Sequence, residues 1–378
     1  MTNHDTHSAQ SWETLGEFAP DWIVTPGEII GDVLAERGWT KTEFAQRTEF
    51  SEKHIHQLLN GTRSITQDTA IKLEKVLGST PRFWLGLEAQ YREQLAKTAD
   101  MAELAADVDW LKELPLSDMI KFGWIQRAAS KPQQVYNCLR YFAVSSVAAW
   151  RLQYQQPVAA YRASGLLTKS PAAVSTWLRQ AEKLADALRC APYDKSRFET
   201  TLTQARALTC ESSSAVFFPQ LQQLCALAGV AVVLAPAPKG CPVSGATKWL
   251  TPQKALVVLS LRGKSDDKFW FTFFHEAAHL LKHGKSLTFL DILGKDGLNA
   301  AEEAEADAFA RNFLLPQDAY KAFVAQARFS QASVCSFAEQ QQTSPGIVVG
   351  RLQFDKRLPW THLNGLKTMY SWDHESLA

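Results

Sequence analysis

The spacing of apolar residues changes along this chain close to residue 211. Before that point apolar residues recur at helical spacing. The clearest stripe is Trp177, Leu178, Ala181, Leu184 and Leu188. After it, short β-branched runs at residues 230–234, 245–250 and 255–261 are separated by Gly and Pro, which is typical of strands. Helical spacing returns at about residues 267–283, 300–315 and 316–326 and around residues 335–351. The sequence therefore predicts a mainly α-helical chain with one small β-sheet, an α+β fold.

Composition and charge exclude several classes of protein. Because 40 Lys and Arg balance 39 Asp and Glu, bulk charge cannot bind the chain to nucleic acid or to a membrane. No apolar run approaches the roughly 20 residues of a membrane helix, and residues 1–19 are too polar for a secretory signal. The six cysteines include no C-x-x-C pair, which indicates reduced thiols. We therefore expect a cytoplasmic protein with no membrane partner.

Residues 26–97 carry five short helical signals with recognisable caps. Thr40 precedes one of them and is expected to form a capping box with Glu43, while Ser51 precedes the next and Gly61 follows it. Residues 41–60 have the helix and turn lengths of a helix-turn-helix, with two short helices joined by a four-residue turn. The second helix is the one expected to enter the major groove of DNA.

This arrangement predicts which side chains contact DNA. We expect Glu52, Lys53 and His56 to face base edges. The residues expected to reach phosphates are Lys41, Asn60, Thr62 and Arg63. Residues 21–94 hold nine Lys and Arg against eleven Asp and Glu, so we expect a homodimer with modest, salt-sensitive affinity for palindromic operator DNA. The alternative is a helical bundle that contacts only proteins.

Residues 25–91, beginning with Thr25 and then PGEIIGDVLAERGWTKTEFAQRT, resemble the XRE-type helix-turn-helix family and are most similar to HigA-type antitoxins. Such antitoxins repress their own operon as dimers and neutralise a toxin that cleaves messenger RNA. The resemblance thus implies an autorepressor with a cognate toxin as a possible partner.

A second motif, HEAAH, occupies residues 275–279 inside a predicted helix. Residues four apart share a helix face, so His275 and His279 can bind one cation while Glu276 points beside it at a bound water. Zn²⁺ is the metal that such ligands ordinarily hold, although other divalent ions remain open. His283 is a poor further ligand, because one more turn moves its ring about 6 Å along the helix axis.

A third ligand has to come from another element. In residues 301–310, Glu303 and Asp307 share a helix face. Glu303 can bind the metal, while Asp307 accepts the free N–H of a ligand histidine and fixes its tautomer. Glu305 is the alternative ligand, and otherwise Glu302 and Glu305 are expected on a solvated face.

Three stretches, FTFFHEAAHLLKHG, EEAEADAFARNFLLP and SPGIVVGRLQ, resemble the ImmA/IrrE metallopeptidase family across about residues 211–352. The resemblance implies a zincin-like domain with zinc ligands His275, His279 and Glu303, with Glu276 as the catalytic base. Family members cleave repressor proteins, often ones with helix-turn-helix domains. Ala278 departs from the Gly that relatives commonly have, and Asp307 stands where Asn is also common.

No donor for a developing oxyanion has a position fixed by spacing. The candidates are His283, His362, Tyr370 and Arg351, and a buried salt bridge is the expected role of Arg351.

These motifs predict five consecutive parts. They are a tail (1–20), a HigA-like helix-turn-helix domain (21–98), a helical middle domain (99–210), a metallopeptidase domain (211–352) and a C-terminal tail (353–378). The favoured hypothesis is a DNA-binding, antitoxin-like autorepressor whose zinc-dependent endopeptidase domain cleaves the chain itself or a partner regulator. The alternative is a non-enzymatic antitoxin that binds a toxin and operator DNA, with the peptidase fold as a sensing or docking module.

Overall fold

The structure is a computed structural model that describes residues 24–155, 170–260, 262, 264–283, 289–292 and 300–370. The expected tail at residues 1–20 lies outside the described residues. The chain divides after Glu103 into two compact units. The finer division into five parts remains a prediction. Among the helices of the described residues, none is both long enough and apolar enough to cross a membrane.

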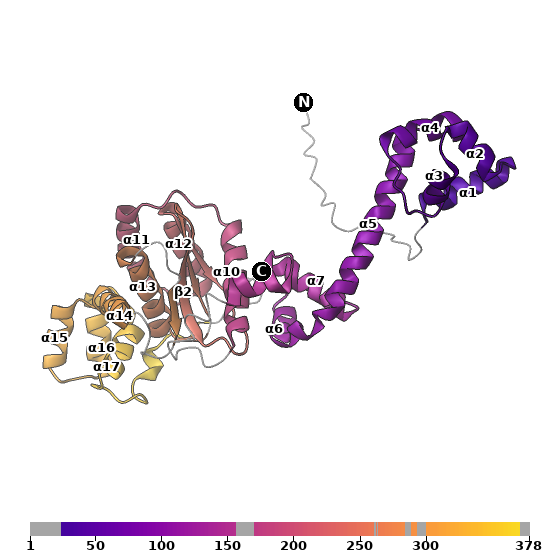
Figure 1. Ribbon diagram of the computed structural model, residues 1–378. Coiled ribbons are helices and arrows are strands. Elements are labelled where there is room, and N and C mark those ends of the chain that lie inside the picture. Colours follow the sequence, from indigo (N-terminus) through magenta and orange to yellow (C-terminus); the bar gives the residue numbers. More distant parts are fainter. Residues whose placement is uncertain are drawn as a thin grey trace, which may run out of the picture. The chain divides into compact units, whose positions relative to one another are not determined.

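The described part of the N-terminal unit is a helical bundle (Figure 1). Its helices are α1 (Pro26–Arg37), α2 (Lys41–Thr48), α3 (Glu52–Leu59), α4 (Gln67–Leu77) and the first part of α5 (Pro81–Ala106). A Thr or Ser side chain accepts a backbone N–H at the start of each of α1 to α4, which satisfies a donor that the helix itself cannot. The last helix is longer than its sequence signal, because it continues past residue 97 to Ala106.

The cap of α2 differs from the expected capping box. The Thr40 side chain accepts the N–H of Glu43, as predicted. The Glu43 carboxylate does not return the bond to Thr40, because it accepts two hydrogen bonds from Arg47 one turn further along. The full capping box lies instead at the start of α1, between Thr25 and Glu28.

The helix-turn-helix consists of α2 and α3 packed on one apolar core. Phe44 of α2 and Ile55 and Leu58 of α3 are buried in this core with Ile30 of α1. The chain reverses between the two helices at Glu49, whose φ of 53° is left-handed. Helices of eight residues are only marginally stable on their own, so α2 and α3 depend on their shared core for stability. The same core contacts set the angle between the two helices.

The second unit begins with helical elements and then builds a sheet domain. The helical elements are η1 (Val108–Lys112), α6 (Leu116–Lys121), α7 (Lys131–Phe142), α8 (Val147–Trp150), η2 (Arg151–Gln155), α10 (Pro171–Ala187), α11 (Lys195–Ala207), η3 (Leu208–Cys210) and α12 (Ser214–Leu227). The later helices lie between or after the strands. They are α13 (Asp266–Lys282), α14 (Ala300–Leu314), α15 (Gln317–Ala325), α16 (Gln331–Gln340), α17 (Pro345–Phe354) and η4 (Asn364–Leu366).

Within the described residues, the sheet has four strands in the order β1-β3-β2-β4. The strands are β1 (Val230–Leu234), β2 (Val243–Thr251), β3 (Lys254–Leu259) and β4 (Phe289–Ile292). The pair β1 and β3 is parallel, with Val232 opposite Val257, whereas β2 runs antiparallel to both β3 and β4. Every residue of β1 is buried, as expected for a strand covered on both faces.

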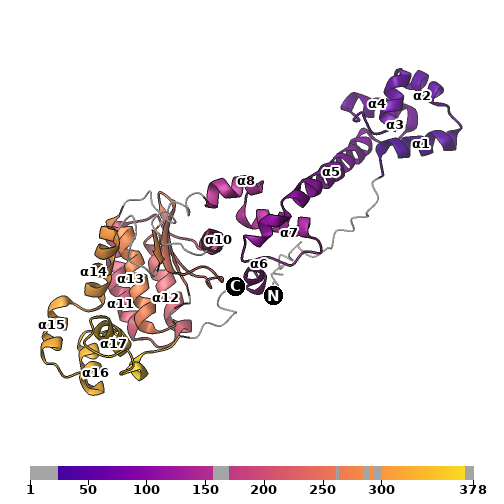
Figure 2. The ribbon, with the colours of Figure 1, turned by 60° about the horizontal axis from the view of Figure 1, so that its bottom comes forward.

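Helices cover both faces of this sheet (Figures 1 and 2). Val230, Val232 and Leu234 point into a core formed with α11, α12 and α13. The alternate residues Ala231 and Val233 point into a second core formed with α10. The apolar stripe of α10 is therefore core, and α10 packs on the sheet while α11 packs on α12 and α13, although both helices precede residue 211.

The predicted α+β class is confirmed, and three strands match the three β-branched runs. Two features were not expected. Strand β4 pairs with β2 at the edge of the sheet. The helical signal around residues 335–351 is two helices, because α16 ends at Gln340 and a new helix, α17, begins at Pro345 with Ser344 as its N-cap.

Candidate metal centre

Helix α13 carries the HEAAH motif through the middle of the domain core. Thirteen of its 17 residues are buried, including His275, Glu276 and His279. Its first residue, Asp266, is fully buried and bonded to Ser344, the N-cap of α17. Burial raises the pKa of Asp266 to about 6. Gly346 lies so close that a Cβ there would be 2.3 Å from the Asp266 carboxylate oxygens. The helix is thus anchored at its N-terminus, two to three turns before the motif.

The two motif histidines face each other on one side of α13. The Nε2 atoms of His275 and His279 are 3.1 Å apart, and the side chains are 3% and 1% exposed. Burial, together with the neighbouring His275 and His283, lowers the pKa of His279 to about 3. His279 is therefore neutral near pH 7, which is the state that binds a metal.

Helix α14 brings carboxylates to the same place. Glu303 Oε2 is 3.1 Å from His275 Nε2, and Glu303 Oε1 is 3.4 Å from His279 Nε2. Packing of α14 on α13 holds this position, since Ala306 and Ala310 are fully buried and Phe313 stacks on Phe274 at 5.0 Å. The ligand atoms of His275, His279 and Glu303 all lie within 4.8 Å of one another.

The spacing of these three groups fits a zinc ion. Ligands about 2.0–2.1 Å from a tetrahedral zinc lie about 3.3 Å from each other. The observed separations of 3.1, 3.1 and 3.4 Å are close to that value. Two imidazoles and one carboxylate are also a donor set of catalytic zinc sites, which leave a fourth position open.

Asp307 lies on the other nitrogen of His275. Its Oδ1 is 3.2 Å from His275 Nδ1, and its Oδ2 accepts a 3.2 Å bond from Arg311. A hydrogen on Nδ1 leaves the lone pair of Nε2 facing Glu303 and His279. Asp307 therefore has the geometry to select the metal-binding tautomer of His275.

Glu276 is held by the neighbouring strand. Its side chain is fully buried, and Thr247 of β2 donates its hydroxyl hydrogen to Glu276 Oε2 at 2.6 Å. A Cβ at Gly245 would be 2.8 Å from Glu276 Oε1, so the strand has room for the carboxylate only because residue 245 is glycine. Sequence reasoning missed Thr247, because β2 carries several polar residues and nothing local distinguishes this one.

His283 and Glu305 lie on the far side of His279. The Nδ1 atoms of His279 and His283 are 2.9 Å apart, on the side of the His279 ring opposite to Nε2. Glu305, the alternative ligand, contacts Lys282 at 2.7 Å and His283 at 3.5 Å and is half exposed. Glu302 is partly buried rather than fully solvated. The three residues that could together hold a metal ion, His275, His279 and Glu303 (the metal-binding group), include neither of the other two glutamates.

The remaining oxyanion candidates make contacts elsewhere. Tyr370 accepts a hydrogen bond from Trp270 in the core, and His362 contacts Thr361 on the surface. Arg351 donates to Asp355 at 2.7 Å and lies over the ring of Tyr320, in agreement with its expected salt bridge.

The seven predicted DNA-contacting residues are all exposed on or beside α3. They are Lys41, Glu52, Lys53, His56, Asn60, Thr62 and Arg63. Glu52 accepts a 2.9 Å hydrogen bond from Thr42, so its carboxylate is partly committed within the protein. His56 contacts Asn60 at 3.2 Å, which links a predicted base-contacting residue to a predicted phosphate-contacting one.

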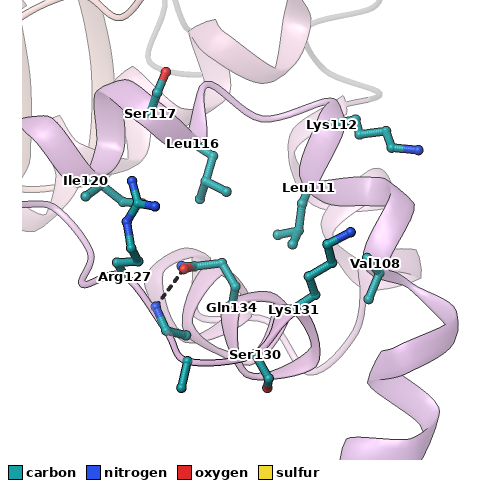
Figure 3. Close-up of a pocket in the computed structure, with 12 residues that line it drawn as sticks. Val108, Leu111, Lys112, Leu116, Ser117, Ile120, Arg127, Ser130, Lys131 and Gln134 are labelled. Carbon is teal, nitrogen blue, oxygen red and sulfur yellow. Dashed lines mark hydrogen bonds between the residues drawn. The ribbon is translucent and has the colours of Figure 1, made fainter.

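A separate cavity of about 460 Å³ lies among η1, α6 and the start of α7 (Figure 3). Its lining includes Arg127, Lys131 and Gln134, and Gln134 accepts the N–H of Ala128. None of its lining residues belongs to the metal-binding group.

Two family models match the chain. The helix-turn-helix model matches residues 30–84, and the model of the IrrE N-terminal-like domain, an M78 peptidase family, matches residues 242–353. The uncharacterized HTH-type transcriptional regulator YddM of Escherichia coli K12 is 36% identical over 80 residues, which are 21% of this chain and 85% of YddM. Virulence-associated protein A' of Dichelobacter nodosus is 36% identical over 67 residues, or 18% of this chain and 58% of that protein.

Two solved structures are similar to the N-terminal region. One, from Nostoc punctiforme, is described as an antidote protein of a plasmid maintenance system; it is 38% identical, with a TM-score of 0.21, over 21% of this chain and 88% of that one. The other is an addiction module antidote of the HigA family from Coxiella burnetii; it is 30% identical, with a TM-score of 0.21, over 22% and 92%. The chain belongs to the helix-turn-helix family of transcriptional regulators, and it carries a C-terminal domain of the M78 peptidase family.

Proposed function

We propose that this regulator is a zinc-dependent peptidase as well as a DNA-binding protein. The observation that carries the proposal is the triangle formed by His275 Nε2, His279 Nε2 and the Glu303 carboxylate, with edges of 3.1 to 3.4 Å. It lies in the domain that matches an M78 peptidase family, and the next residue after the first histidine is a buried carboxylate, Glu276. The three side chains would hold the ion and Glu276 would act on a water beside it.

The chemistry divides between the ion and the protein. Zinc, when bound, supplies a Lewis acid that polarises a peptide carbonyl and makes water more acidic. Glu276 accepts the proton of the attacking water and passes it to the leaving amine, so the peptide bond breaks with one water consumed. Thr247 orients the Glu276 carboxylate, and Asp307 keeps the hydrogen of His275 on Nδ1.

The proposed substrate is a protein, either this chain or a partner regulator. The support is the presence of a regulator domain and a peptidase-family domain in one chain. On the DNA side, we propose that a homodimer binds a palindromic operator through α3, with Lys53 and His56 at base edges and Arg63 at phosphates.

A second candidate function is a non-enzymatic antitoxin that binds a toxin and operator DNA, with the zinc site as a structural or docking element. The observation that favours it is the position of Glu276, which is 0% exposed and committed to Thr247. A general base in this position needs access to a water, and full burial limits that access.

One substitution separates the two candidates. Glu276→Gln removes the base and leaves the three proposed ligands in place. Zinc-loaded full-length wild type is incubated alone and with β-casein, and cleavage products are identified by mass spectrometry. We expect products from the wild type and a loss of at least about 100-fold in the variant. Equal amounts of product from both proteins would favour the non-enzymatic candidate. So would the absence of product from either protein under all conditions, provided that both proteins still repress the promoter of their own operon.

A further inference from the structure

The contacts of His279 continue beyond the metal-binding group. Its Nε2 faces His275 and Glu303, while its Nδ1 lies 2.9 Å from the Nδ1 of His283. The other ring nitrogen of His283 lies 3.5 Å from Glu305, whose second oxygen lies 2.7 Å from Lys282. A chain of contacts thus runs from the proposed metal position through two imidazoles to a carboxylate of α14.

The distance between the two Nδ1 atoms decides where the hydrogens are. Two neutral ring nitrogens 2.9 Å apart attract only when one carries a hydrogen and the other presents its lone pair. A neutral histidine that binds a metal through Nε2 carries its hydrogen on Nδ1. His279 is therefore the donor and His283 the acceptor. The hydrogen of His283 must then be on Nε2, the nitrogen that faces Glu305.

The same geometry excludes His283 as a direct ligand. Its ring contacts the nitrogen of His279 that points away from His275 and Glu303. Its side chain is 5% exposed, so the ring is held in this position by its surroundings.

We propose that His283 and Glu305 form a positioning arm that fixes the metal-binding tautomer and orientation of His279. This inference rests on the proposed zinc site. A matching arm serves the other histidine, since Asp307 contacts His275 directly and is itself paired with Arg311. Both arms end on a carboxylate of α14 that is paired with a cation. His279 lies one turn further along α13, and on its Nδ1 side His283 lies between the His279 ring and the Glu305 carboxylate.

The arm predicts that an acceptor at residue 283 matters more than a ring. In His283→Gln the side-chain oxygen can accept the N–H of His279, whereas His283→Leu offers no acceptor. Zinc affinity is measured on metal-free full-length protein by competition with a chromophoric chelator. We expect His283→Leu to weaken binding about 10- to 100-fold, as loss of such orienting partners does, and His283→Gln to stay within about 5-fold of wild type.

Three further variants complete the design. Glu305→Gln alters a half-exposed side chain and is expected to leave the fold intact while weakening zinc binding about 2- to 10-fold. Its matched control is Glu339→Gln on the surface of α16. The control for His283→Leu is His362→Leu, an exposed histidine that contacts Thr361. Both controls are expected to bind zinc as the wild type does.

Two readouts distinguish positioning from packing. The visible spectrum of the Co²⁺-loaded protein should change in His283→Leu and return toward wild type in His283→Gln, while the melting temperatures of the metal-free proteins report on the fold. Equal zinc affinities for the Leu, Gln and wild-type proteins would overturn the arm. An equal loss in Leu and Gln, or an unchanged affinity in Glu305→Gln, would also overturn it. His275→Ala separates the two levels of inference, because zinc binding that survives this change refutes the metal site itself.

Discussion

Thr247 and Glu276, 29 positions apart in the chain, are joined by a 2.6 Å hydrogen bond between the central part of β2 and the HEAAH helix. The Thr247 hydroxyl also lies 3.1 Å from the backbone carbonyl oxygen of Glu276. Both groups are buried, so water does not replace this hydrogen-bond donor when it is removed. The strand therefore fixes the orientation of the one motif side chain that is not a proposed ligand.

Thr247→Val should destabilise the protein while leaving zinc content unchanged. Valine has the shape of threonine but no donor, so the buried Glu276 carboxyl group loses a hydrogen bond, at a cost of about 1–3 kcal/mol. Urea unfolding followed by fluorescence measures the loss. Thr251→Val, at the exposed end of β2, is the control and should change the free energy of unfolding by less than about 0.5 kcal/mol. Equal effects of the two changes would contradict the importance of this bond.

Metal content tests the proposed ligands. Wild type should bind about one zinc per chain, His275→Ala or His279→Ala should lose it, and Glu276→Gln should keep it. Glu303→Gln should weaken binding far more than Glu305→Gln, because Glu303 faces both imidazoles. Metal content is measured by mass spectrometry after gel filtration. Full zinc content in a protein lacking both motif histidines would refute the assignment.

DNA binding tests the orientation of α3. Lys53→Ala and His56→Ala should reduce the preference of the full-length protein for the DNA upstream of its own gene over unrelated DNA. Each lost base contact should lower this preference by about 1–3 kcal/mol. Arg63→Ala should instead weaken binding to both DNAs alike and lower the salt dependence. Fluorescence anisotropy at several salt concentrations measures both effects. If a Lys53, His56 and Arg63 triple variant binds as the wild type does, α3 is not the reading helix.

Asp266 should make stability fall as pH rises from 4 to 6. Burial raises its pKa to about 6 in the folded protein, whereas a carboxyl in the unfolded chain titrates near about 3.9. The folded protein thus keeps a proton that the unfolded chain releases, so the stability from this group is complete below pH 4 and is lost through pH 6. The difference corresponds to at most about 3 kcal/mol.

The matched variant is Asp266→Asn, which cannot titrate. Subtracting its free energy of unfolding from that of the wild type at each pH isolates the contribution of Asp266 from those of other groups, including His279. The difference should decline between pH 4 and 6. A flat difference would contradict the raised pKa.

Helix periodicity and the i,i+4 rule predicted which side chains of one helix lie together at the proposed metal centre. They grouped His275 with His279 and Glu303 with Asp307, because both pairs depend only on the geometry within one helix. The contact between Glu276 and β2 was not accessible in this way. Thr247 is 29 positions from Glu276, and no local pattern links a strand threonine to a helix carboxylate.

Competition between local interactions explains the other differences. Glu43 has two partners within reach, and the charged Arg47 binds it in place of the Thr40 backbone. Residues 335–351 hold two apolar stretches separated by six polar residues, and Pro345, which has no N–H to donate to a preceding turn, begins a new helix after them. Strand β4 is four residues long, too short for its alternation to stand out from chance.

Helix α10 covers one face of the sheet, although it lies before the residues that match the peptidase family. The part of the chain that matches the family is therefore shorter than the part that can fold on its own. The family match begins at residue 242 and the motif-bearing region near 211, yet Trp177 and Val174 fill the face formed by Ala231, Val233 and Val258. A piece cut at 211 would expose that face to water. The smallest piece that keeps this sheet face covered therefore starts before Pro171, and α10 belongs to the core of the peptidase-family domain.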